Sequence, residues 1–193
     1  MKKNSSKLLL TLSLLVLLPR LASAHILLGT SHGFADGFLH PLTGWDHLLA
    51  MFAVGLWAAQ HRGRALWLIP SSFVGVMLLG GILGLAGLSV PGAQAAIALS
   101  VLALGGLVAT MTRFRPSLSM MVVGLFALFH GYAHGHEMPA AAAALPFSIG
   151  FVLSTAFLHG LGIAAGLRLR QQPRVLRWAG AAIAASSFCF FVG

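Results

Sequence analysis

Long apolar segments, separated by short polar turns, make up most of the chain. Six of them are each about long enough to cross a bilayer as a helix, and we place them at residues 42–60, 65–87, 94–111, 117–135, 145–167 and 175–192. The strands of a membrane barrel would be shorter and would alternate apolar with polar residues, which these segments do not. The pattern predicts an all-α polytopic membrane protein with six transmembrane helices.

The N-terminal residues 1–24 have the pattern of a secretory signal peptide. A basic end is followed by the apolar run 8–18 and by Ala22-Ser23-Ala24, a small-residue cleavage pattern. Cleavage there would make His25 the new N-terminus, whose amine and imidazole could chelate one metal ion together. An uncleaved anchor with His25 at the interface is the alternative. We therefore expect a signal peptide at 1–24 and a single six-helix transmembrane domain at 25–193.

Composition and charge agree with a membrane protein and orient it. Hydrophobic residues make up 58% of the 193 residues and charged residues only 8%, against about 25% in a typical soluble domain. The net charge of +9 comes from scattered basic residues and does not indicate nucleic-acid binding. After residue 24, basic residues occur only in alternate turns: Arg62 and Arg64, then Arg113 and Arg115, then Arg168, Arg170, Arg174 and Arg177. The positive-inside rule places these turns in the cytoplasm and both mature termini on the periplasmic side of a bacterial inner membrane.

One stretch of ionisable residues opens the first apolar segment, where residues 40–47 read HPLTGWDH. His40 and His47 are seven residues apart, so they share a helix face if the helix already runs there, and Pro41 would suit its first turn. Asp36 lies four residues before His40. Asp46 points elsewhere, toward another helix or toward a ligand histidine as a hydrogen-bond acceptor.

A second stretch ends the fourth segment, where residues 129–137 read FHGYAHGHE. His130 and His134 are one helical turn apart, a good spacing for two imidazoles on one cation, and Glu137 extends the same stripe. His136 lies off this face. Ionisable groups inside a membrane are costly and usually functional. Because both stretches lie at outer ends of their segments, we expect them to converge on a metal ion.

Two further histidines lie apart from these stretches. His159 is about 21 Å along the fifth segment from its outer end, past the midplane of the membrane. A deeper metal site and a hydrogen bond to Ser154, Thr155 or another helix are both open interpretations. His61 follows the first segment in a cytoplasmic turn, where we expect it to be solvated.

Glycines four residues apart predict close helix packing. They are Gly80 and Gly84, Gly131 and Gly135, and Gly162 and Gly166. The middle pair alternates with histidines, so it could also leave room for a metal ion.

The two motifs together resemble the HupE/UreJ family of nickel permeases. The resemblance is carried by His40-Pro41-x-x-Gly44-x-Asp46-His47 and by Phe129-His130-Gly131-x-Ala133-x-Gly135-x-Glu137, with a weaker element at Phe157-Leu158-His159-Gly160. It implies uptake of nickel, in some members cobalt, and delivery to metallochaperones for hydrogenase or urease. It also nominates a ligand set: His40, Asp46, His47, His130 and Glu137. His134 and His136 fall on variable positions of the motif, so their roles depend on spacing alone.

The residues by themselves leave three functions open. Neutral imidazoles with a few carboxylates suit Ni²⁺, Co²⁺, Zn²⁺ or Cu²⁺ better than Mg²⁺ or Ca²⁺. The chain has no phosphate-cradling glycine-rich motif, so a permease would be secondary and not ATP-driven. The alternatives are an intramembrane zinc-dependent hydrolase and a haem-binding membrane protein with paired axial histidines. For the permease we expect no catalytic residue and no permanently bound cofactor; homo-oligomerisation stays open.

Overall fold

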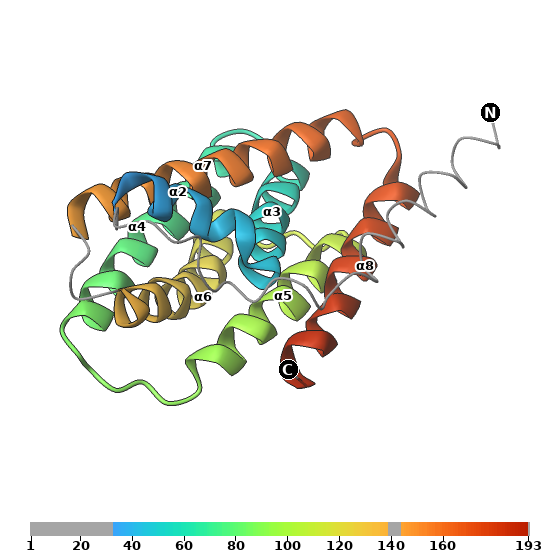
Figure 1. Cartoon of the computed structure of the whole chain (residues 1–193). Coiled ribbons are helices and arrows are strands. Elements are labelled where there is room, and N and C mark those ends of the chain that lie inside the picture. The colour runs from blue at the N-terminus through green and yellow to red at the C-terminus, as the bar shows by residue number, and fades with distance from the viewer. Residues whose placement is uncertain (1–32, 139–143, 193) are drawn as a thin grey trace.

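The computed structural model describes residues 33–138 and 144–192, which form a bundle of helices (Figure 1). These residues contain seven helices and no strand, so the all-α prediction is confirmed. The helices are α2 (Phe34–Thr43), α3 (Trp45–Gln60), α4 (Ala65–Leu85), α5 (Ala93–Thr110), α6 (Pro116–Glu137), α7 (Ala144–Arg168) and α8 (Pro173–Val192). The expected signal peptide and His25 lie outside the described residues.

A bend at Gly44 separates the short helix α2 from α3. Gly44 has an extended backbone, with φ −84° and ψ 112°. Its N–H group donates to the carbonyl of His40 and its carbonyl accepts from Leu48, so it ends one helix and begins the next. His40 and His47 therefore lie on separate helices, and the condition for a shared helix face is not met. Glycine is a poor helix former, and it interrupts the helix here.

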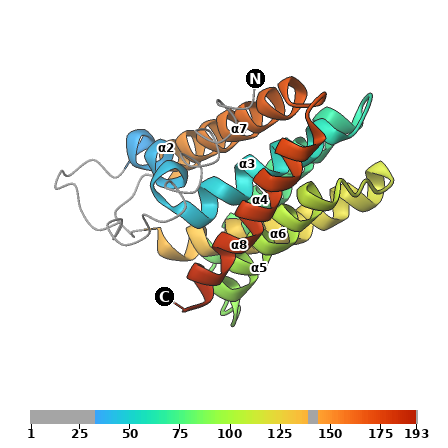
Figure 2. The ribbon, with the colours of Figure 1, turned by 90° about the vertical axis from the view of Figure 1, so that its right-hand side faces the viewer.

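Helix α2 packs against α7 at one end of the bundle (Figure 2). A Cβ on Gly37 would collide with the backbone of Phe147, and one on Gly150 would collide with the backbone of Phe34. The two helices thus approach to backbone contact. This contact fixes the position of α2, the helix that carries His40.

Two parallel pairs of helices are packed equally closely through glycine. In the α4–α6 pair, a Cβ on Gly80 or Gly84 would collide with α6 backbone, and one on Gly131 or Gly135 with α4 backbone. All four positions face the neighbouring helix, so the spacing of Gly131 and Gly135 serves packing. In the α3–α7 pair, Gly55 and Gly162 face each other in the same way.

Four helices in the described part of the chain, α4 to α7, are long and apolar enough to cross a membrane. Helix α3 has 16 residues, about 24 Å of helix, because the bend at Gly44 shortens it. Helix α8 packs against α5 within the same bundle. A membrane protein is thus confirmed, whereas the six-span count and the orientation remain predictions.

The basic turns meet at the C-terminal end of α3. Arg170 donates to the carbonyls of Ala59 and His61, at 3.2 and 3.3 Å, and Arg113 donates to that of Gln60 at 3.4 Å. His61 is only 5% exposed. Its Nδ1 is 3.0 Å from the carbonyl oxygen of Trp57, one turn earlier in α3, and its Nε2 is 3.1 Å from the hydroxyl of Ser119 in α6. The expectation of a solvated His61 is therefore wrong, because its ring is enclosed between Trp57 and Ser119.

Candidate metal-binding site

Four imidazoles from three helices meet near the α2 end of the bundle. The ring of His134 in α6 is 4.3 Å from that of His47 in α3 and 4.8 Å from that of His40 in α2, between ring centroids. The ring of His130 is 5.1 Å from that of His47. His40 and His47, although on separate helices, are 6.4 Å apart. The expected convergence of the two motifs is thus present, and we call these four residues the histidine cluster.

Two of the four rings are held so that Nε2 is available to a ligand. The carboxylate of Asp46 accepts a hydrogen bond from Nδ1 of His47 at 2.7 Å, and the carbonyl of Phe126 accepts one from Nδ1 of His130 at 3.0 Å. A proton on Nδ1 leaves the lone pair on Nε2, as in many metal-binding histidines. Within the described residues neither Nε2 atom has a hydrogen-bond partner.

Asp46 therefore orients a histidine of the cluster. Its Oδ1 also accepts from the backbone N–H of His47 at 2.8 Å, and its Oδ2 accepts from Gln94 at 3.4 Å. Of the two alternatives for Asp46, the hydrogen bond to a histidine of the site is present. That histidine is its neighbour His47, because the first turn of α3 lets the carboxylate fold back. Gln94 is a contact that the sequence did not suggest.

Glu137, which is exposed, lies beside the histidine cluster on the α6 side. One ligand atom each from His40, His134 and Glu137 lies within 4.8 Å of the others, a spacing compatible with one metal ion. His134 is 5% exposed, and neither of its ring nitrogens has a hydrogen-bond partner in the residues described. The i, i+4 stripe of His130 and His134 thus faces the histidines of α2 and α3 as expected.

The environment of His40 favours its neutral, metal-binding form. Burial lowers the pKa of His40 below its ordinary value, the neighbouring His47 lowers it further, and the carboxylate of Asp46 opposes these effects. A metal ion competes with protons for imidazole nitrogen. A lowered pKa therefore keeps His40 available at neutral pH.

The less certain candidates lie outside the cluster. Asp36 is exposed on the first turn of α2, and His136 is exposed and stacked on Tyr132, with ring centroids 5.7 Å apart. Neither contributes to the ligand group found in the described part of the chain. His159 is buried deeper and joins the cluster only indirectly, through the ring of Phe73.

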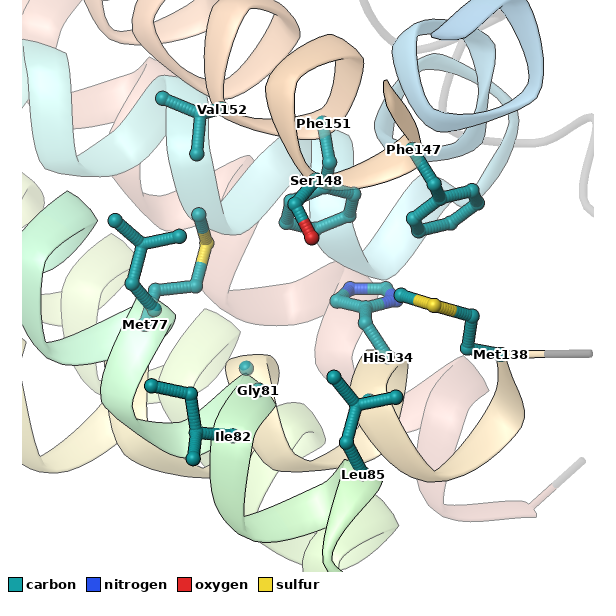
Figure 3. A pocket seen from close by; sticks show the side chains of 13 residues that line it. Met77, Gly81, Ile82, Leu85, His134, Met138, Phe147, Ser148, Phe151 and Val152 are labelled. Atoms are coloured by element: carbon teal, nitrogen blue, oxygen red, sulfur yellow. The ribbon is translucent and has the colours of Figure 1, made fainter. Parts of the chain in front are cut away.

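A mostly apolar cavity of about 260 Å³ borders the cluster between α4, α6 and α7 (Figure 3). His134 forms part of its wall, with Phe147, Ser148 and Phe151 around the imidazole. Met77 lines the same cavity from α4. The cavity therefore extends from the histidine cluster toward the sulfur of a buried methionine.

The fold and site together define an all-helical membrane protein with a buried histidine cluster. Comparison with known sequences agrees with this class and narrows it. The family described as "HupE / UreJ protein" matches residues 12–190, and the chain belongs to this family. Protein HupE of Rhizobium leguminosarum bv. viciae is 44% identical over 190 residues, which cover 97% of this chain and 98% of that protein. No solved structure matches the chain.

Proposed function

We propose that the protein is a secondary uptake permease for a divalent transition metal, with nickel as the main substrate and cobalt as a further candidate. The convergence of four imidazoles from α2, α3 and α6 supports this proposal most directly. Nitrogen ligands of this kind suit Ni²⁺, Co²⁺, Zn²⁺ and Cu²⁺. The choice of nickel rests on the motifs of the HupE/UreJ family and not on ligand chemistry.

The ligands would capture the ion on the periplasmic side of the inner membrane. Nε2 of His47 and of His130, together with His40, His134 and Glu137, form the ligand set, and Asp46 orients His47. A divalent ion moving inward gains about 4.6 kcal/mol per 100 mV of membrane potential, or roughly a thousandfold accumulation. This suffices for scavenging a trace metal without ATP. Delivery to hydrogenase or urease metallochaperones follows from the family resemblance alone.

Uptake by purified protein in liposomes tests the proposal. Nickel influx would be followed with a trapped metal-sensitive dye while a potassium gradient and valinomycin set an inside-negative potential. We expect influx that rises with the potential and is inhibited by competing cobalt. Protein-free liposomes give the control, and influx equal to theirs for Ni²⁺, Co²⁺, Zn²⁺ and Cu²⁺ would contradict a permease.

The same preparation separates the alternatives. An intramembrane hydrolase would retain stoichiometric zinc through washing, and a haem protein would show a visible absorption band. A permease releases its ion easily, because a transported ion must leave its site.

A further inference from the structure

A second group of donor atoms lies deeper in the bundle than the histidine cluster. The hydroxyl of Thr155 in α7 is 3.3 Å from Sδ of Met51 in α3 and 3.9 Å from Sδ of Met77 in α4. Two sulfurs from different helices thus converge on one hydroxyl. None of the three residues is more than 2% exposed.

The imidazole of His159 belongs to the same region. His159 follows Thr155 by one turn of α7, so both side chains lie on one face of that helix. It is 2% exposed, and neither ring nitrogen has a hydrogen-bond partner among residues 33–138 and 144–192. The interpretation of His159 as a histidine bonded to Ser154 or Thr155 is therefore not supported. Buried polar groups are nearly always hydrogen-bonded, so an unpartnered imidazole indicates a further role.

This group continues the histidine cluster inward. Met51 lies one turn beyond His47 along α3. The ring of Phe73 is 5.7 Å from that of His130 and 5.2 Å from that of His159, between centroids. Counted from the inner ends of their helices, His130 lies at about 21 Å and His159 at about 14 Å. The cavity lined by His134 is also lined by Met77 (Figure 3).

We propose that Met51, Met77, Thr155 and His159 form a second metal site, on the path from the histidine cluster toward the cytoplasm. This proposal rests on the permease function proposed above. Thioether sulfur and imidazole nitrogen bind soft and borderline transition-metal ions, whereas Mg²⁺, Ca²⁺ and Mn²⁺ prefer oxygen. The second site would therefore select against hard cations after the first site has captured an ion.

Packing alone explains the methionines less well than a metal path does. Methionine fills irregular gaps in a core, and leucine often does the same. Core packing does not require the two sulfurs to meet a hydroxyl beside an unpartnered histidine. Replacing both methionines by leucine nearly conserves volume while removing the donor atoms, so it separates packing from binding.

X-ray absorption on selenomethionine-labelled full-length protein tests the site directly. With Ni²⁺ added in excess, the nickel edge should show scattering from selenium. This signal should disappear in Met51→Leu/Met77→Leu and fall in each single variant. It should persist in Met121→Leu, a control whose side chain is 65% exposed. Absence of nickel–selenium scattering in the unsubstituted chain, or its loss in Met138→Leu rather than in the double variant, would overturn the proposal.

Transport supplies a second measurement. In liposomes, His159→Gln and the double methionine variant should lower maximal nickel influx by about tenfold or more while the half-saturating concentration stays within about twofold. Normal influx in both variants would overturn the proposal even if the permease function holds. Nickel–selenium scattering from a chain that shows no nickel influx in liposomes would leave the second site standing and remove the permease function.

Discussion

Nδ1 of His47 lies 2.7 Å from the carboxylate of Asp46, the residue that precedes it in the chain. The same carboxylate oxygen accepts from the backbone N–H of His47 at 2.8 Å. The two bonds fix the ring relative to the start of α3 and keep its proton on Nδ1. The motif therefore pairs a candidate ligand imidazole with its own orienting acid, next to each other in the sequence.

Replacing Asp46 by asparagine tests this pairing. The change keeps the shape of the side chain and removes its charge, which weakens the bond to Nδ1 and its hold on the tautomer. We expect about tenfold to a hundredfold weaker nickel binding, the usual effect of losing such a partner. Titration of purified protein with Ni²⁺ measures it. Gln94→Ala, which removes only the 3.4 Å contact to the other oxygen, is the matched control and should bind within about twofold of the original.

Two histidines of the α6 motif, the buried His130 and the exposed His136, differ in expected function. His130→Ala should abolish nickel uptake at normal protein levels, because it removes an Nε2 that faces the other imidazoles of the cluster. His136→Ala should leave uptake nearly unchanged, because His136 is exposed and stacks on Tyr132 outside the cluster. Proteoliposome influx with both variants checks the pair. Loss of uptake in His136→Ala alone would contradict the ligand set.

His61 should affect stability and not metal binding. Its replacement by alanine removes the contacts with the Trp57 carbonyl and with Ser119 and leaves buried polar groups unpaired. We expect a loss of about 1–3 kcal/mol in stability. Thermal unfolding in detergent measures the loss, and nickel titration of the folded fraction should give an unchanged affinity. A large change in affinity without a change in stability would assign His61 to the metal path.

The glycines of α7 allow a matched comparison of close packing. A Cβ on Gly162 would collide with the backbone of Phe52 in α3, whereas one on Gly160 meets no atom of the described residues within 4 Å. Gly162→Ala should therefore destabilise the protein by about 1–3 kcal/mol, and Gly160→Ala should not. Thermal unfolding of both variants checks this. Equal melting temperatures would mean that α3 and α7 are packed less closely than described.

Uptake should depend on external pH through the ligand histidines. Imidazole binds metal only when neutral, so protons compete as pH falls, and the half-saturating nickel concentration should rise between about pH 7.5 and 5.5. The pKa of His40 is lowered. Its protonation should therefore contribute to this rise only at pH values below about 6.5, the ordinary pKa of imidazole. Initial uptake rates at a clamped membrane potential measure the effect. A maximal rate that climbs with acidity would instead indicate proton-coupled transport.

The helical fold and the meeting of the two motifs could be predicted because each depends on a local pattern. Apolar length predicts helices in a membrane. The alternate basic turns predict that the starts of segments 42–60 and 145–167 lie on the same side of the membrane as the ends of segments 65–87 and 117–135. His130 and His134 share a face because they are four residues apart in a regular helix. These parts of the site needed no knowledge of distant contacts.

The remaining features depend on long-range packing, which periodicity does not encode. The bend at Gly44 places His40 on its own helix, and only the contact of α2 with α7 brings it back to His134. The sequence places His61 in an exposed turn, because Ser119, the residue that binds its ring, is far away in the sequence. The sulfurs of Met51 and Met77 were missed, although Met51 follows His47 by one turn and could have been noticed there.

The glycine contacts divide the donor atoms between two closely packed units. One unit is α3 with α7 and the attached α2, which carry His40, His47 and His159; the other is α4 with α6, which carry His130 and His134. Each pair is locked by backbone contact, whereas the ligand set crosses the boundary between them. A small tilt of one pair against the other would change the coordination sphere without deforming any helix. In the proposed permease, movement at the boundary between the two pairs would therefore be enough to release a bound cation.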